Sequence, residues 1–373
     1  MPLITATIVV VLIYVLQKVI YAKTWSKGLG ASCRFSRDYI DCGESAELRL
    51  VVENAKYLPL PIFQLKFSVE KSLEFEDMVN AAITDKYYKS EVFALMSNQR
   101  VTRKLSFIGA ARGVVTISDM SMIVHDFLMS SAFAATIGDS DTIYVFPRKM
   151  VDMRFDMFFR GIVGNIETRR SLIEDRLTFR GIREYQPFDG MRSINWKQSA
   201  KSGDLMVNVR GYSMDSEVKI LVNLDTDSMI EVDRVFEETL SLASSFTRRI
   251  LLSKMAVSLY VNALDRNGNI IHETGSGQDI SHGITIDKVL TEVKTSRGSD
   301  IFIQKIESEI KSASENTHYL IISPYHKEDL MEKIELLKSA GAGVNMIVPF
   351  YHTYPYQPDA DYISGWEVNL HAS

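Results

Sequence analysis

Cysteine is scarce in this sequence of 373 residues: only Cys33 and Cys42 are present. Two cysteines do not make a disulfide framework, and we expect two reduced thiols in a cytosolic domain. Because the two residues flank a predicted turn, a bond across a hairpin is the alternative. An excess of positive charge is also missing, since the formal net charge is -5. This charge argues against a nucleic-acid-binding protein that works through overall charge.

Motifs of common enzyme classes are missing as well. The sequence has no Walker loop, no dinucleotide-binding glycine pattern and no zinc motif. Its histidines are scattered, and His272 and His282 are most simply loop residues on either side of a glycine-containing stretch. The sequence therefore offers no convincing catalytic constellation, and we expect no cofactor.

The composition is that of a globular protein. Hydrophobic residues make up 46% and charged residues 24%, so neither a disordered chain nor a wholly embedded membrane protein fits. The length allows two or three domains with cores of their own.

One long uncharged run stands out, over residues 2–16, and Gln17 and Lys18 follow it. At about 1.5 Å per residue, residues 2–22 span about 30 Å, enough for one membrane crossing. Tyr21 and Trp25 suit the membrane interface. We therefore predict a transmembrane anchor over residues 1–24. A cleaved signal peptide is the weaker alternative, because no basic residue precedes the run and no small-residue cleavage site closes it.

The orientation of the anchor follows from charge. The basic residues lie after the start of the run: Lys18, Lys23, Lys27, Arg34 and Arg37. The positive-inside rule then predicts a single-pass protein of the cell membrane with cytoplasmic soluble domains.

Residues 28–150 alternate between apolar and polar side chains. The clearest examples are residues 46–52, 62–69 and 101–107. Short alternating stretches separated by turn residues predict an antiparallel β-sandwich. His125 and Asp126 stand side by side here, but neighbours on a strand point to opposite faces, so we interpret them as a turn at a strand end rather than a metal pair.

From residue 217 the pattern changes to alternating strands and helices. A buried strand is predicted over residues 218–224, followed by an amphipathic helix over 231–254, and the alternation continues towards residue 349. Residues 217–373 are therefore predicted to form a doubly wound α/β domain. With the sandwich, the fold class is an α+β multidomain chain.

Residues 151–216 connect the two domains and carry a densely charged stretch. A turn at residues 187–190 precedes Ile194 and Trp196, and a second turn at residues 201–204 leads into a strand. The residues that define the pattern are Arg183, Tyr185, Pro187, Asp189, Arg192, Ile194, Trp196, Lys197, Ser199, Ala200, Gly203 and Leu205.

This pattern resembles the signature of the bacterial and archaeal family called domain of unknown function 58. The departure is Phe188, where the family usually has glycine. The resemblance implies a von Willebrand factor A-like fold for residues 217–373. It also implies partnership with a MoxR-class AAA+ ATPase, and often with a transglutaminase-like membrane protein.

Domains of von Willebrand factor A type often bind a divalent metal at the carboxyl edge of the sheet. Here Asp225 matches the first ligand and Asp227 is able to replace the next, but Met229 is a poor ligand for Mg²⁺. Ser323 stands where a later acidic ligand is expected. These departures favour the alternative that Asp225 and Asp227 cap the next helix or order the loop.

The resulting hypothesis is a membrane-anchored, non-enzymatic scaffold. We expect Trp196 to be a buried anchor, and the partner-contacting residues to be Arg183, Tyr185, Asp189, Arg192, Trp196 and Lys197. An interdomain latch built from the same residues is the structural alternative. The functional alternative is a divalent-metal-dependent receptor or hydrolase that uses the acidic loop at Asp225.

Overall fold

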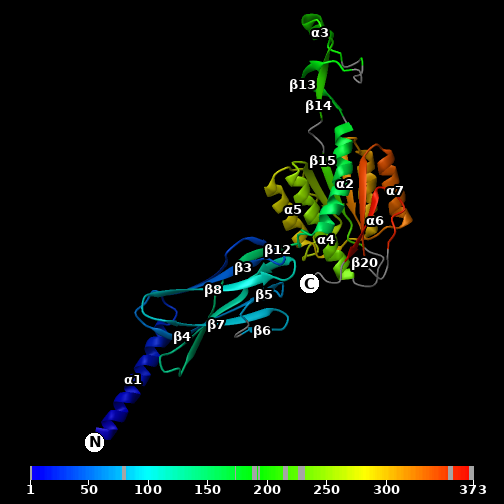
Figure 1. The fold of residues 1–373 in the computed structure, drawn as a ribbon. Helices are drawn as coiled ribbons and strands as arrows, with labels where there is room; N and C mark the ends of the chain where they lie inside the picture. The colour runs from blue at the N-terminus through cyan, green and yellow to red at the C-terminus, as the bar shows by residue number, and fades with distance from the viewer. Residues whose placement is uncertain are drawn as a thin grey trace. The chain divides into compact units, whose positions relative to one another are not determined.

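A computed structural model describes residues 2–77, 81–172, 174–186, 191, 194–212, 217–225, 232–351 and 356–368. The chain divides into two compact units, Met1–Arg148 and Lys149–Ser373. Figure 1 shows the elements of both units.

The first unit begins with helix α1 (Pro2–Thr24), which is long and apolar enough to cross a membrane. Its apolar side chains from Leu3 to Leu16 are exposed, whereas Tyr21, near its C-terminal end, is buried in the core of the same unit. The end of the helix is thus part of the folded domain, and the rest extends away from it (Figure 1).

The strands that follow form three sheets. Their orders are β1-β3-β8-β5, β11-β10-β4-β7-β6 and β2-β12-β9. The bounds are β1 (Leu29–Phe35), β2 (Tyr39–Asp41), β3 (Ser45–Asn54), β4 (Leu60–Val69), β5 (Leu73–Phe75), β6 (Ala81–Ile83), β7 (Tyr87–Leu95), β8 (Gln99–Gly109), β9 (Gly113–Thr116), β10 (Ser118–His125), β11 (Ala132–Thr136) and β12 (Thr142–Phe146).

Alternation places one face of each long strand in a shared core. On β3, Leu48, Leu50 and Val52 are fully buried, and the residues between them are more exposed. Phe63 of β4 and Phe107 of β8 join the same core, although these strands belong to different sheets. The two larger sheets therefore face each other as a β-sandwich, as the period-two pattern predicted. Both cysteines are free thiols.

The second unit is built on a five-stranded parallel sheet of order β16-β15-β19-β20-β21. The strands are β15 (Glu217–Val222), β16 (Ala256–Val261), β19 (Thr317–Ile322), β20 (Gly343–Tyr351) and β21 (Ile363–Val368), and a two-stranded sheet pairs β17 (Ala263–Leu264) with β18 (Thr295–Ser296). The helices are α4 (Val232–Leu252), α5 (Ile280–Glu292), α6 (Ser299–Lys311) and α7 (Glu328–Ser339).

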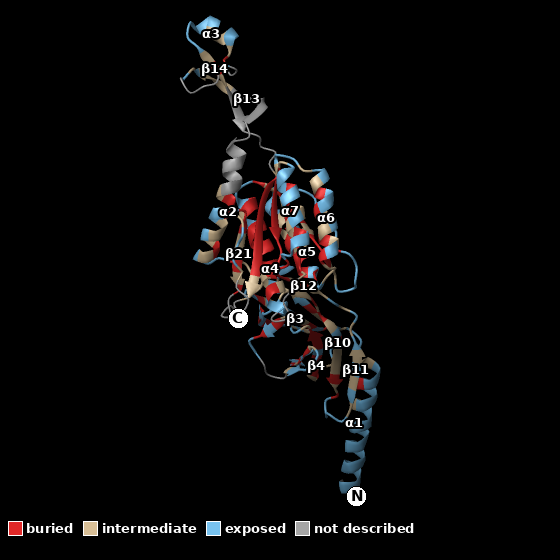
Figure 2. Cartoon of the chain, turned by 90° about the vertical axis from the view of Figure 1, so that its right-hand side faces the viewer, coloured by how far each residue is buried: buried red, intermediate tan, exposed pale blue. Residues whose placement is uncertain are grey.

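Both faces of the parallel sheet are covered. Val218, Ile220 and Val222 of β15 share a core with α4 and α5, whereas Leu221 shares one with α6 and α7. Figure 2 shows the buried strands between these helices. This arrangement confirms the prediction of strands alternating with helices and explains why the strands read as continuous apolar runs.

Between Lys149 and β15 lie α2 (Met153–Leu172), β13 (Glu174–Glu184), α3 (Trp196–Ser202) and β14 (Met206–Tyr212). The first half of α2 packs into the core of the second unit. Phe155 is fully buried and lies edge-on to Phe246 and Trp366, with ring centroids 5.3 and 6.2 Å away. The sequence predicted only that residues 151–216 connect the two domains.

Candidate functional site

The signature segment folds as an antiparallel hairpin, β13–β14, that carries the short helix α3 between its strands. The side chain of Asn195 accepts a hydrogen bond from the backbone N–H of Gln198 at 3.0 Å, which caps the start of α3. Gly203 ends the helix in the left-handed conformation, at φ 83°. The side chain of Asn195 therefore defines the start of the helix, and the backbone conformation of Gly203 defines its end.

Further hydrogen bonds fasten α3 to the strand that follows it. The backbone N–H of Met206 donates to Ser199 Oγ at 2.8 Å, and the N–H of Asn195 donates to the Met206 carbonyl at 2.7 Å. Asn195 Nδ2 also donates to Asn208 Oδ1 at 2.7 Å. Asn195 thus links the helix to β14 through both its backbone and its side chain.

The predicted contact residues have different surroundings in this hairpin. Arg183 and Tyr185 are half-buried on and just after β13, and the guanidinium of Arg183 donates to the Glu184 carbonyl. Lys197 is exposed on α3. Asp189 and Arg192 lie outside the described residues.

The prediction that Trp196 is a buried anchor is wrong, because its side chain is 63% exposed. It is the first residue of α3, and this two-turn helix has no buried residue. Among the described residues between β13 and α3, Ile194 is the buried one, and it pairs with the buried Val207 of β14. The indole therefore lies on the surface of the hairpin, and Met191 and Leu205 are exposed there too.

The second candidate site lies at the carboxyl ends of β15, β16 and β19. Ligands of open α/β sheets bind at this edge, where the strand order reverses, and here it reverses between β15 and β19. The position is occupied by a buried polar network: Asn223 Nδ2 donates to Ser323 Oγ at 3.0 Å, and Asn262 Nδ2 donates to Asn223 Oδ1 at 2.6 Å. Asn223, Asn262 and Ser323 are fully buried.

Asp225, the predicted first metal ligand, lies beside this network and contacts α6. Its Oδ2 accepts hydrogen bonds from the backbone N–H of Ser299 at 3.0 Å and from Ser299 Oγ at 2.6 Å. Ser299 is the first residue of α6, so Asp225 caps a helix that is distant along the chain. Asp227 and Met229 lie outside the described residues.

A cation at this edge would have to compete with Ser299 for Oδ2 of Asp225. Ser323 is engaged as well, since its hydroxyl donates to the Tyr325 carbonyl at 2.6 Å. In the part of the chain that the structure describes, no group of three or more His, Cys, Asp or Glu side chains is placed to hold a metal ion. Nothing in the sequence pointed to Ser299, Asn223 or Asn262.

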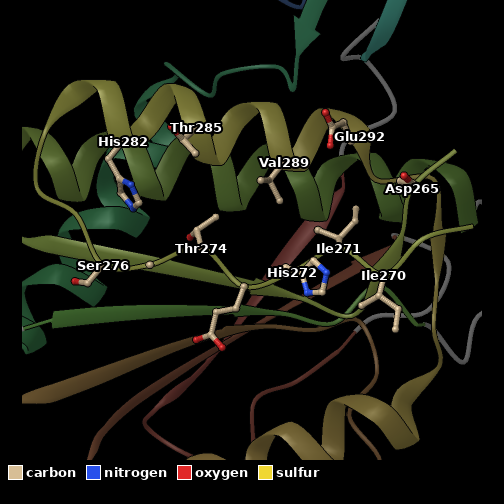
Figure 3. A pocket seen from close by; sticks show the side chains of 12 residues that line it. Asp265, Ile270, Ile271, His272, Thr274, Ser276, His282, Thr285, Val289 and Glu292 are labelled. Carbon is tan, nitrogen blue, oxygen red and sulfur yellow. The ribbon is translucent and has the colours of Figure 1, made fainter. Parts of the chain in front are cut away.

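A pocket of about 520 Å³ lies between α5 and residues 265–276 (Figure 3). His272 and His282 line this pocket. The Nε2 atom of His282 lies 3.0 Å from the Val257 carbonyl oxygen, within hydrogen-bonding distance. His282 lies in the first turn of α5, so the prediction that it is a loop residue was wrong. Hydrogen bonds from Asn269 and from neighbouring backbone N–H groups lower the pKa of Asp265, whose carboxylate orders the turn at residues 265–269. His282 and Asp265 therefore have structural roles beside this pocket.

No protein-family model matches the chain, and no curated protein matches it. Among solved structures, a non-cellulosomal cohesin from Archaeoglobus fulgidus is 13% identical, with a TM-score of 0.22, over 34% of this chain and 96% of its own. A cohesin–dockerin complex from Clostridium thermocellum gives 8% identity and a TM-score of 0.24, over 31% of this chain and 98% of that one. A CARDB domain from Pyrococcus furiosus, in complex with di-metal ions, is 12% identical, with a TM-score of 0.22. The match covers 32% of this chain and 93% of that one. At these scores the likeness bears on no function of this chain.

Proposed function

We propose that this chain is a membrane-anchored scaffold that is held in the cell membrane by α1 and contacts a partner protein through the hairpin β13–α3–β14. The basic residues after the start of α1 favour an orientation with the soluble units in the cytoplasm. Following the resemblance to the domain of unknown function 58 family, the partner that we propose is a MoxR-class AAA+ ATPase. A transglutaminase-like membrane protein is the expected companion.

The observation that carries this proposal is the group of exposed apolar side chains on the hairpin. Met191 is 74% exposed, Trp196 63% and Leu205 47%. Tryptophan and methionine are enriched at protein interfaces, and tryptophan is among the residues that contribute most to binding energy. The exposed Lys197, which follows Trp196 in the sequence, adds a charged group of the kind found at an interface rim.

The structure of the hairpin also favours recognition. The caps at Asn195 and Gly203 fix α3 before any partner arrives, so ordering the contact surface costs little entropy on binding. The α/β unit supports the resemblance as well, because a parallel sheet with helices on both faces is what a von Willebrand factor A-like domain requires.

The test is affinity purification of the tagged full chain from native membranes, followed by binding measurements with the purified ATPase. We expect Trp196→Ala to weaken binding at least about thirtyfold, the effect of a residue worth about 2 kcal/mol. Leu336→Ala on α7 is the matched control, because Leu336 is 46% exposed and lies in the same unit. If the Trp196→Ala variant binds every partner as the unchanged chain does, and its thermal stability is also unchanged, the proposal is wrong.

A further inference from the structure

The β-sandwich has one end at which the chain enters from α1. The strand register places Leu29, the first residue of β1, opposite Asn54 at the end of β3, and Asn54 opposite Gln99 at the start of β8. In the other large sheet, Leu60 pairs with Leu95, and Val124 near the end of β10 pairs with Phe63. The turns β3–β4, β7–β8 and β10–β11 therefore share the end where α1 joins the domain.

Each of these turns exposes large apolar side chains. The β10–β11 turn exposes three consecutive ones, Phe127 at 61%, Leu128 at 53% and Met129 at 61%, which we call the apolar tip. Tyr57 in the β3–β4 turn is 88% exposed, and Met96 in the β7–β8 turn is 68% exposed. Such a concentration of apolar groups at one end of a domain marks a surface that is covered in the working protein.

Hydrogen bonds fix this end of the sandwich to α1. Gln17 Nε2 donates to Asp126 Oδ2 at 3.2 Å, directly before the apolar tip, and Tyr21 donates its hydroxyl proton to the Pro59 carbonyl at 2.7 Å. The ammonium of Lys56 donates to the Thr24 carbonyl at 3.1 Å, at the end of the helix. Gln17 precedes Thr24, the last residue of α1, by seven residues. Asp126, at the start of the apolar tip, therefore contacts α1 about 10 Å along the helix axis from its C-terminal end.

The apolar tip has a defined conformation. Asp126 is fully buried, and its Oδ1 accepts hydrogen bonds from the backbone N–H groups of Ser130 at 2.6 Å and Ser131 at 3.1 Å. Burial alone would raise the pKa of Asp126, but these hydrogen bonds and those from the Ser130 hydroxyl and Gln17 lower it overall. The turn is thus held by a charged carboxylate, and its exposed side chains are presented on an ordered loop.

We propose that the apolar tip inserts into the lipid bilayer beside α1, in the leaflet that holds the C-terminal end of this helix. Tyr57 and Met96 then lie at the headgroup level of the same leaflet. This inference rests on the proposed membrane anchoring. The bilayer is the occupant that the structure favours, because the tip lies alongside a helix whose own side chains from Leu3 to Leu16 require lipid.

The chemistry around the tip fits this placement. Trp25 stacks on Phe133 of β11, with ring centroids 5.8 Å apart, and aromatic rings of this kind favour the membrane interface. Lys18, Lys23 and Lys27 are positioned along the same stretch to reach headgroup phosphates. With α1 and the tip both inserted, the sandwich stands on the membrane in one orientation instead of moving freely on a tether.

The test uses the full chain, reconstituted into vesicles of phosphatidylcholine and phosphatidylglycerol. In a Cys42→Ser background, single variants Leu128→Cys, Ile83→Cys and Val11→Cys are labelled with a polarity-sensitive fluorophore. Ile83 is the matched control, because it is 51% exposed and pairs with Tyr87, at the opposite end of β7 from Leu95. Val11 reports on the anchor itself.

We expect spin-labelled lipids to quench the labels at Leu128 and Val11, and aqueous iodide to quench the label at Ile83. If iodide quenches the label at Leu128 and spin-labelled lipid does not, while lipid still quenches the label at Val11, the inference about the tip is overturned and the anchor remains supported. A Val11 label outside the lipid would overturn the anchor and the inference together. Shielding of Leu128 from both quenchers would mean that a second copy covers the tip, which also overturns the lipid assignment.

Discussion

Cys33 and Cys42 differ in the property that controls thiol reactivity. Burial, together with the Asp139 carboxylate nearby, raises the pKa of the Cys33 thiol to about 12. Cys42 is partly exposed, and its sulfur lies 3.5 Å from the Ala110 carbonyl. Because the thiolate is the reactive species, the raised pKa keeps Cys33 in the unreactive thiol form at pH 8.

We therefore predict that the folded chain reacts with one equivalent of a thiol reagent at pH 8, and with two after unfolding in denaturant. Cys42→Ser should abolish the reaction of the folded protein, whereas Cys33→Ser should leave it unchanged. Absorbance of the released thiolate follows both steps. Rapid modification of Cys33 in folded Cys42→Ser would contradict the prediction.

Single residues also show where the sequence was and was not informative. The sequence marked this segment by its pattern, but the prediction that Trp196 is a buried anchor was wrong. Size decides burial only where the backbone turns a side chain inward, and here the inward position belongs to Ile194, two residues earlier. Asp225 was recognised as important, but its partner Ser299 is 74 residues away and carries no signal of its own.

At the scale of elements, one carboxylate connects two strands and a helix of the second unit. Glu309 of α6 is buried, and its Oε2 accepts hydrogen bonds from Lys219 of β15 at 2.9 Å and from Tyr319 of β19 at 3.0 Å. Lys305, one turn earlier on α6, contacts Oε1 at 2.6 Å. Burial raises the pKa of Glu309, but the two ammonium groups outweigh it, so the pKa is lowered overall.

A lowered pKa means that folding favours the ionised form of Glu309. Its contribution to stability is therefore present above the ordinary glutamate pKa of about 4.3 and is lost as the pH falls through the lower pKa of the folded state. We predict that Glu309→Gln lowers the free energy of unfolding by about 2 kcal/mol at pH 7, and by progressively less as the pH falls below about 4. Urea denaturation across this pH range measures the difference, and a difference independent of pH would contradict the assignment.

Elements themselves were predictable where the apolar pattern was long and regular. The alternation on β3 and the helical spacing on α4 gave elements close to those in the structure. Helix α5 was missed because Gly283 and the β-branched Thr285 and Ile286 weaken its helical signal. It forms because Ile286 and Leu290 are buried in the core shared with α4, which is a tertiary effect.

At the scale of the whole molecule, the sequence predicted the change of architecture but not where the second unit begins. Lys149 is the first residue of that unit, and its ammonium contacts Asp287 Oδ2 of α5 at 2.6 Å and the Ser244 hydroxyl of α4. Both charged side chains are nearly buried, at 9% and 11% exposure. The unit therefore begins with a buried ion pair that links its first residue to two helices.

Removing one member of such a pair leaves the other charge buried without a counterion. We predict that Lys149→Met lowers the free energy of unfolding of the second unit by about 3 kcal/mol. Lys149→Met/Asp287→Leu should recover part of this loss, because neither charge then remains. Urea denaturation is monitored through the fluorescence of the buried Trp366, in a background in which Trp25 and Trp196 are replaced by Phe. The signal then reports on the second unit alone, because Trp366 is the one tryptophan that remains.

The matched control is Lys294→Met, since Lys294 is an exposed lysine of the same unit. Its effect should stay within about 0.5 kcal/mol, as is usual for surface substitutions. Equal stabilities for Lys149→Met and Lys294→Met would show that the pair does not hold the start of the unit. A larger loss for Lys149→Met, partly reversed in the double variant, would show that the ion pair between Lys149 and Asp287 stabilises the second unit.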